Sequence, residues 1–216
     1  RSQSQSAENK NLKVAQPQFN IDHTSWAIPS AEGEYQKVKN ELYAYRTALT
    51  KVNNQSAQFY ARSDNLRAWI QEATKRLGSY SQRLSASVGR EQLNVDLAGD
   101  SVAQQSTSSA ASMQLKTSWW AIDNEFYEAR GACWALLHFL KAIEIDFNDV
   151  LEQKNAKVSV QQIIRELEAS QESIWSPLVL NGDGFGILAN HSLVMANYIS
   201  RANAALIDLN DLLSQG

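Results

Sequence analysis

The sequence predicts an all-α protein, an elongated antiparallel bundle of about five helices with one long mobile loop. Apolar residues recur at alternating steps of three and four over long stretches, which is the spacing of helix faces that pack together. Only three prolines occur in 216 residues, so long helices are permitted through most of the chain. No stretch alternates apolar and polar residues for long enough to indicate a sheet.

The composition limits the class of protein. Apolar residues make up 44% of the chain and charged residues 20%, as in a globular protein. The net charge of −3 gives no reason to expect nucleic acid or an anionic membrane as a partner. The single cysteine, Cys133, excludes an internal disulfide and any multi-cysteine metal site. No apolar run approaches the roughly 18 residues that a membrane span requires.

Residues 1–29 are polar and are expected to be partly disordered, whereas residues 30–216 are expected to form a single helical bundle domain. The chain begins at Arg1 without a methionine, which indicates a fragment or a processed product. Ser30 is expected to cap the first helix. The predicted packing face of this helix carries Tyr35, Val38, Leu42, Tyr45, Leu49 and Val52.

The second predicted helix has the same periodicity, and a long loop follows it. Its apolar positions are Leu66, Ile70, Ala73, Leu77, Tyr80 and Leu84. Residues 89–116 include the polar, low-complexity string "DSVAQQSTSSAAS". We therefore expect this segment to be a mobile loop.

The third predicted helix keeps the three-and-four alternation from Trp119 to Val150, and Trp134 widens its apolar stripe. This helix is therefore expected to lie centrally, with Trp134 and the other tryptophans of the helical stripes in the core. Gly131 lies in mid-helix and is expected to permit a close helix crossing. Cys133 lies within the apolar stripe, where a thiol behaves as a small hydrophobe.

The last two predicted helices are separated by a turn. Ser159 and Gln162 match a capping box, and Val158 is placed to contact Ile163, so a helix is expected to begin at Ser159 and to end before Pro177. The final helix is expected from about Ile187 to Leu213. Its predicted packing face carries Leu188, His191, Met195, Tyr198, Ala202, Ala205, Leu209 and Leu212.

The motifs of common catalytic and metal sites are missing. A di-iron bundle site needs glutamate three residues before histidine, and none precedes His23, His138 or His191 in this way. No Gly-x-Ser-x-Gly or Walker-type sequence occurs. We therefore predict no catalytic residue, no metal site and no cofactor.

The string "NGDGFG" at residues 181–186 resembles a ligand-binding loop but lacks the required spacing. Its glycines do not match a dinucleotide fingerprint, and an EF-hand alignment loses two carboxylates. Two interpretations of this string remain: a turn between two helices, and an anion-binding site at the start of a helix. Trp175, Asn181, Asp183 and His191 are the candidate contacts for a ligand or partner, while Trp26 is a second loop-flanking tryptophan.

Several stretches together are similar to a known family. They are "FYARSDNLRAWI", "QRLSASVG", "DLAGD", "FYEARG", "IIRELEASQESIWSPLVLNGDGFG" and "LANHSLVMANYISRANAALIDL". The chain thereby resembles domain-of-unknown-function family 2333 of Gram-negative bacteria over residues 17–216. The resemblance implies an inner-membrane protein with one N-terminal membrane segment upstream of Arg1 and a soluble, periplasmic C-terminal portion. It implies no catalytic residues.

We therefore expect a non-enzymatic, membrane-anchored envelope protein whose helical domain is a scaffold or interaction module. Its expected partners are other envelope proteins or a second copy, with no nucleic acid, and with the membrane contacted only through the upstream anchor. The alternative is a sensor or small-ligand-binding bundle that uses Trp175, the glycine-rich loop and His191. A hydrolase of envelope polymers is the second alternative, and it requires a carboxylate within about 3 Å of His191 or one water away.

Overall fold

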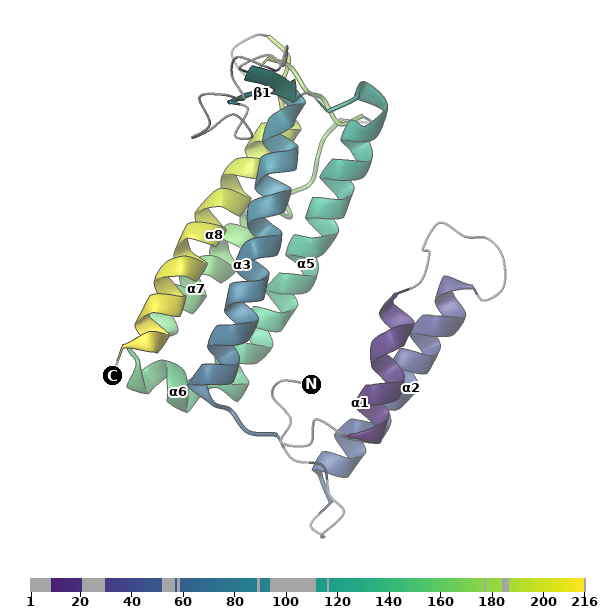
Figure 1. Ribbon diagram of the computed structural model, residues 1–216, viewed down its shortest axis with the longest axis vertical. Helices are drawn as coiled ribbons and strands as arrows, with labels where there is room; N and C mark the ends of the chain where they lie inside the picture. The colour runs from purple at the N-terminus through teal and green to yellow at the C-terminus, as the bar shows by residue number, and fades with distance from the viewer. Residues whose placement is uncertain are drawn as a thin grey trace, which may run out of the picture. The chain divides into compact units, whose positions relative to one another are not determined.

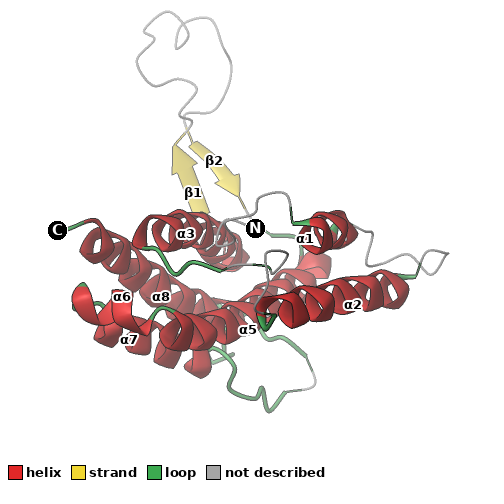
Figure 2. Ribbon diagram, turned by 90° about the horizontal axis from the view of Figure 1, so that it is seen from below, coloured by secondary structure: helices red, strands yellow, loops and turns green. Residues whose placement is uncertain are grey.

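The structure, a computed structural model, describes residues 9–20, 30–51, 57, 59–88, 90–93, 112–115, 117–176, 178–183 and 187–215. These residues form seven α-helices and one short two-stranded sheet, so the all-α prediction is confirmed (Figures 1 and 2). The five helices of 13 residues or more correspond to the five predicted ones. The chain divides into two compact units, Arg1–Trp69 and Ile70–Gly216.

The first unit pairs a short helix with a long one. Helix α1 spans Lys10–Ala15 and continues into the 3-10 turn Gln16–Phe19, while α2 spans Ala31–Leu49. The side-chain amide of Asn11 donates a hydrogen bond of 2.7 Å to Glu41, which holds α1 on α2. Part of the segment predicted as polar and partly disordered is therefore helical, and its residues 1–8 and 21–29 lie outside the described part.

Helix α2 begins as predicted, but its apolar face is only partly buried. The hydroxyl of Ser30 accepts a hydrogen bond of 3.3 Å from the amide of Gly33, which confirms the predicted N-cap. Val38 is buried, whereas Tyr35, Leu42 and Leu49 are exposed. The periodicity therefore located the apolar face of α2 without showing how much of it is covered.

The second unit is a bundle around a continuous apolar core. It contains α3 (Ser63–Ser85) from Ile70 onward, α5 (Ile122–Asp146), α7 (Lys157–Ala169) and α8 (His191–Ser214). Helix α7 packs on α5 and α8 (Figure 1). The largest fully buried side chains of the second unit are Ile70, Leu77, Leu84, Leu140, Leu151, Val160, Ile163, Leu167, Ile199, Leu206 and Leu209. Since burial of one such side chain contributes about 1.5–3 kcal/mol, these residues stabilise the bundle.

The third predicted helix is interrupted, and the fourth starts earlier than predicted. Helix α5 ends at Asp146, and a short helix α6 follows over Asn148–Gln153. Asn155 then adopts a left-handed conformation with φ of 51°, and the amide of Ala156 donates a bond of 2.8 Å to the carbonyl of Leu151. This reversal lets α7 begin at Lys157.

The predicted capping box at Ser159 is therefore wrong. Ala156 precedes the first turn of α7, which has no side-chain cap, and Val158 is exposed, so it does not contact Ile163 as predicted. Burial of Ala156 and Val160 sets the helix start instead. The gain from burying these two side chains outweighed a local capping preference of about 1 kcal/mol.

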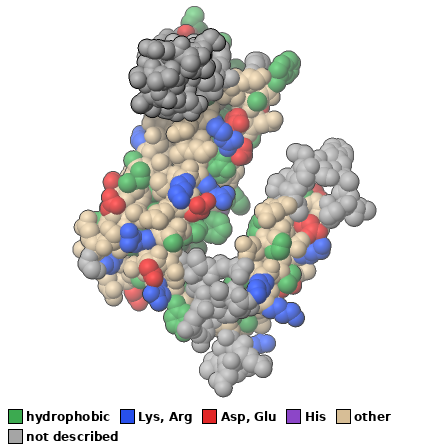
Figure 3. All heavy atoms as spheres, viewed as in Figure 1, with side chains coloured by type: hydrophobic (Ala, Val, Ile, Leu, Met, Phe, Trp, Pro, Cys, Tyr) green, Lys and Arg blue, Asp and Glu red, His purple; other side chains and the backbone are tan. Residues whose placement is uncertain are grey.

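An ion-pair cluster joins α3 to α5 within the second unit. The Arg83 guanidinium lies 2.8 Å from Glu125 and 2.9 Å from Glu128, and it lies over the Tyr80 ring at 4.9 Å. The hydrogen bond from Arg83 lowers the pKa of Glu128, and the same bond raises the pKa of Arg83. Charged and apolar side chains are interspersed on the molecular face shown in Figure 3.

A short antiparallel hairpin lies within the segment predicted as a loop. Strand β1, Arg90–Leu93, pairs with β2, Ser112–Leu115, in the register Arg90 to Leu115 (Figure 2). Four residues per strand are too few for the alternation of apolar and polar residues to stand out in a sequence. Residues 94–111, which carry most of the predicted mobile loop, lie outside the described part of the chain.

Replacing Glu128 by glutamine is expected to lower the free energy of unfolding at pH 7 by no more than about 1 kcal/mol, because Glu128 is half exposed and water screens its pair. The pKa of Glu128 is lowered in the folded state, so its contribution is present above the ordinary value of 4.5 and is lost as the pH falls below it. Urea denaturation of wild type and Glu128→Gln should therefore give different stabilities at pH 7, and the difference should shrink as the pH is lowered from 4.5 towards 3. Asp208→Asn, at an exposed position on α8, serves as the control; a constant difference across this range would contradict the prediction.

Candidate functional site

A cavity of about 360 Å³ lies in the second unit, between α5, the chain that follows α7, and the first turns of α8. Its lining residues are Phe126, Arg130, Ala169, Ser170, Glu172, Ser173, Ile174, Trp175, His191, Val194, Met195 and Tyr198. Apolar walls and a few polar groups, including a histidine and an arginine, are the usual composition of a small-molecule site.

Arg130 builds one wall of this cavity. From α5, its guanidinium donates hydrogen bonds of 2.8 Å to the carbonyl of Glu172 and 2.6 Å to the carbonyl of Gln171. In return, the side-chain amide of Gln171 donates to the carbonyl of Arg130 over 3.2 Å. The two carbonyls that Arg130 binds lie just beyond Ala169, the last residue of α7, so Arg130 fixes the direction in which the chain leaves that helix.

His191, the first residue of α8, forms part of the opposite wall. Its Nδ1 accepts a hydrogen bond of 2.9 Å from the amide of Leu180, and its own amide donates one of 2.8 Å to the carbonyl of Leu180. Because Nδ1 accepts this bond, Nε2 carries the ring proton of the neutral side chain. His191 is half-buried and therefore provides one N–H donor at the edge of the cavity.

Two asparagines close the loop before α8. Asn190 caps the helix, since its Oδ1 accepts a bond of 2.8 Å from the amide of Leu193, and its side-chain nitrogen donates to the carbonyl of Gly182. Asn181 forms an antiparallel bridge with Asn190 and accepts a bond of 3.3 Å from the amide of Ser192. Asn181 therefore has a structural role, because its contacts hold the loop closed.

The same cap corrects the predicted start of the final helix. We expected that helix from about Ile187, but α8 begins at His191, because Asn190 supplies the cap. Ile187 and Leu188 are exposed and precede the helix, so Leu188 is not part of its packing face.

The structure brings together two of the four predicted contact residues. Trp175 and His191 line the same cavity, and Trp175 is 100% exposed, so it contributes to the rim. Asn181 and the exposed Asp183 do not line it. Residues 184–186 of the glycine-rich loop and Trp26 lie outside the described residues. Arg130, whose role was not predicted, could be assigned only from its contacts with the chain after α7.

Cys133 lies within the core, and Ser170, which lines the cavity, contacts it. Burial raises the pKa of the Cys133 thiol to about 12, and a hydrogen bond with Ser170 opposes that shift in part. The thiol therefore stays protonated near neutral pH and is not a nucleophile. No group of three or more His, Cys, Asp and Glu side chains suited to a metal ion occurs among the described residues.

The outward side of α5 carries a second feature, an aromatic face made by Tyr127, Gly131, Trp134, His138 and Ile145. The side chains of Tyr127, Trp134 and Ile145 are 59%, 57% and 77% exposed, and the rings of Trp134 and His138 meet at 4.4 Å between centroids. The prediction that Trp134 lies in the core is therefore wrong, and it is wrong for Trp120 as well, which is 91% exposed. The α-helical period identifies a stripe, but only the neighbouring helices determine which part of it is buried.

Gly131 occupies an open position on this α5 aromatic face. A Cβ atom added at Gly131 would meet nothing within 4 Å among the described residues, so no other described helix of the second unit crosses α5 there. The predicted close helix crossing is therefore not found in the described part of the chain. Among the described residues of the second unit, no packing contact at Gly131 offsets the roughly 1 kcal/mol that glycine costs in a helix relative to alanine.

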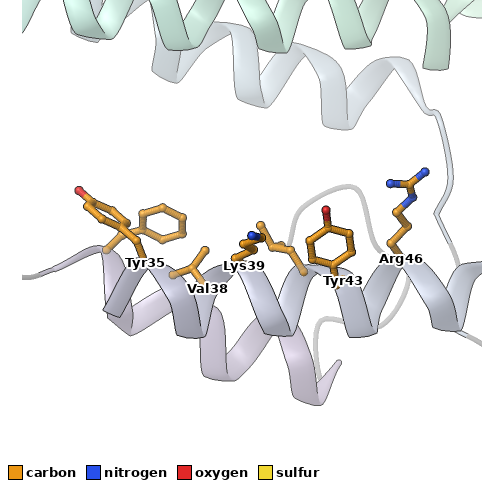
Figure 4. A pocket seen from close by; sticks show the side chains of 7 residues that line it. Tyr35, Val38, Lys39, Tyr43 and Arg46 are labelled. Carbon is orange, nitrogen blue, oxygen red and sulfur yellow. The ribbon is translucent and has the colours of Figure 1, made fainter. Parts of the chain in front are cut away.

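The first unit has an open groove of about 490 Å³, formed by Phe19 and α2. Aromatic and basic side chains line it, and Figure 4 shows Tyr35, Tyr43 and Arg46 projecting from the same side of α2. Its full lining is Phe19, Tyr35, Val38, Lys39, Leu42, Tyr43 and Arg46. No helix among the described residues is both long and apolar enough to cross a membrane.

Gly182→Ala is expected to lower the free energy of unfolding by about 1–3 kcal/mol, because the added Cβ would overlap the backbone carbonyl of Leu188 in the closed loop. Urea denaturation measures this loss. Gly131→Ala is the matched control: its Cβ enters open space in a helix, so the same measurement should show a gain of up to about 1 kcal/mol. An equal loss for the two substitutions would contradict the open position of Gly131, and an equal gain would contradict the tight packing at Gly182.

Comparison with known proteins identifies the family of the chain. No curated protein and no solved structure matches the sequence. The match to a family extends over the whole chain, residues 1–216, and that family, DUF2333, is described as "Uncharacterized protein conserved in bacteria". The chain therefore belongs to the DUF2333 family of bacterial proteins.

Proposed function

We propose that this protein is a non-enzymatic interaction module of the bacterial cell envelope, with the α5 aromatic face as its contact surface. The envelope location, a membrane anchor upstream and a periplasmic position of the helical domain follow from the family resemblance. The proposed partners are other envelope proteins or a second copy of the chain. The exposed α5 aromatic face is the single observation that supports this role.

The composition of this face is typical of an interface centre. Tryptophan and tyrosine are enriched in the few residues that contribute most of the binding energy between proteins. Trp134, His138 and Tyr127 are close together on one exposed helix face, and Gly131 leaves a notch among them. Exposed rings and an open glycine do not stabilise the fold, whereas both suit a surface that accepts side chains from a partner.

Photocross-linking in living bacteria tests this function. With p-benzoylphenylalanine in place of His138 in the full-length protein, illumination should give a discrete band of higher mass. Trp134→Ser should reduce that band at least roughly tenfold, because losing a central aromatic residue costs 2 kcal/mol or more.

The matched control places the same photoreactive amino acid at the exposed Asp208 of α8. The discrete band should be absent from that position. Absence of a band from position 138, or the same bands from both positions, would contradict the proposal.

We propose ligand binding in the cavity of Trp175 and His191 as a second candidate function. The specific observation in its favour is the combination of a largely apolar lining, the His191 ring and the anchored Arg130 segment. The indole N–H of Trp175 and the Nε2–H of His191 fit a small molecule that carries a carboxylate or another acceptor group.

A thermal-shift screen of small carboxylates and other envelope metabolites tests this second function. A ligand at 100 times its dissociation constant adds about 2.7 kcal/mol to stability, which for a chain of this size raises the melting temperature by roughly 5–10 °C. His191→Ala should remove the shift and Trp134→Ser, on the other surface, should keep it. A flat screen, or a shift that survives His191→Ala, would count against a ligand site here.

A further inference from the structure

We infer that the α5 aromatic face binds the same face of a second copy of this chain, with the two α5 helices antiparallel around a two-fold axis between residues 132 and 133. This inference rests on the proposed function, and it names the partner. A closed dimer with two-fold symmetry uses the same patch on both copies, so the face must be complementary to itself.

The residues of the face share one side of the helix. At 100° per residue, Tyr127, Gly131, Trp134, His138 and Ile145 fall within an arc of roughly 60°. All five are exposed. The face therefore extends over about 18 residues of α5, or roughly 27 Å, which is long enough for one helix to pack along it.

An antiparallel register makes the shape of the face self-complementary. With the axis between residues 132 and 133, Gly131 of one copy lies opposite Trp134 of the other, and symmetry repeats this contact. The indole then enters the space left open by the missing side chain of Gly131. Tyr127 lies opposite His138 in the same register, and Ile145 reaches the level of the exposed Trp120.

A parallel register fits less well. It would place Trp134 opposite Trp134 and Gly131 opposite Gly131, so the two bulkiest groups would coincide and the two notches would leave a void. Close-packed interfaces disfavour both arrangements.

Charge favours the antiparallel register as well. Asp123 and Lys141 lie on the same edge of α5, about 50° from the centre of the face. In the antiparallel pair that edge meets itself, so Asp123 of each copy lies within one residue of the level of Lys141 of the other. Lys141 is half exposed while it pairs with Glu168 at 2.6 Å, so its charge remains accessible.

Sedimentation of the 216-residue chain measures its mass in solution and so tests whether it forms a dimer. At tens of micromolar, the wild type is expected at twice 24.1 kDa. Gly131→Leu fills the notch and Trp134→Ser removes the group that enters it. Each substitution should therefore raise the dissociation constant of the dimer at least tenfold. Leucine favours helix more than glycine does, so Gly131→Leu should keep or raise the melting temperature of the monomer and thereby exclude unfolding as the cause.

Disulfide trapping tests the register. Asp123→Cys combined with Lys141→Cys should give a covalent dimer on mild oxidation, because each pair meets across the two-fold axis. Each single cysteine variant should stay monomeric under denaturing conditions, since its two copies are about 27 Å apart in this register and the bond needs Cα atoms within about 7 Å. The native Cys133 is buried and does not compete.

The outcomes separate this inference from the proposed function. A wild-type monomer, a dimer that survives Gly131→Leu, or disulfides formed by the single variants would overturn the antiparallel pair. If the photocross-linked band from position 138 has a mass other than twice that of the protein, the interaction function stands and a second copy is not its partner. A dimer with the expected variant and disulfide behaviour supports the inference.

Discussion

The hydrogen bonds between Arg130 and the carbonyls that follow α7 are the contact on which the geometry of the cavity in the second unit depends. They fix the direction in which the chain leaves α7, because the guanidinium from α5 holds the backbone oxygens of Gln171 and Glu172, just beyond the helix end. From there the chain runs to the bridge of Asn181 and Asn190, which sets the first turn of α8. The cavity with Trp175 and His191 lies between these two fixed points. Its shape follows from hydrogen bonds at helix ends as much as from the apolar core.

The α5 helix separates what periodicity can predict from what it cannot. The spacing of Phe126, Cys133 and Leu140 predicted a buried stripe, and all three are buried. Trp134 shares the helix and the apolar character but faces outward, because no other described helix of the second unit covers that side. A sequence indicates which side of a helix is apolar, but the number of neighbouring helices that cover that side depends on the whole fold. Similarly, Ser159 has a capping sequence, yet the reversal at Asn155 placed the start of α7 two residues earlier.

The candidate site was predictable only in part, for a related reason. Trp175 and His191 stood out because aromatic and imidazole side chains beside a loop are unusual, and both line the cavity. Asn181 stood out as a ligand-type residue, but its side chain bonds to the amide of Ser192. Arg130 gave no local signal, since its partners are about 40 residues away in sequence. Residues that act through distant backbone atoms become visible only once the helices are placed.

The buried Cys133 also makes the interior of this bundle observable. Its thiol is enclosed where α5 meets the end of α7, and Ser170, which touches it, also lines the cavity. A thiol reagent in solution reaches such a sulfur only when the surrounding helices separate, so the rate of labelling measures how often that separation occurs. Because the chain has a single cysteine, the signal comes from one known position. The labelling rate of Cys133 therefore reports how often the core of the bundle opens, and no further cysteine has to be introduced to measure it.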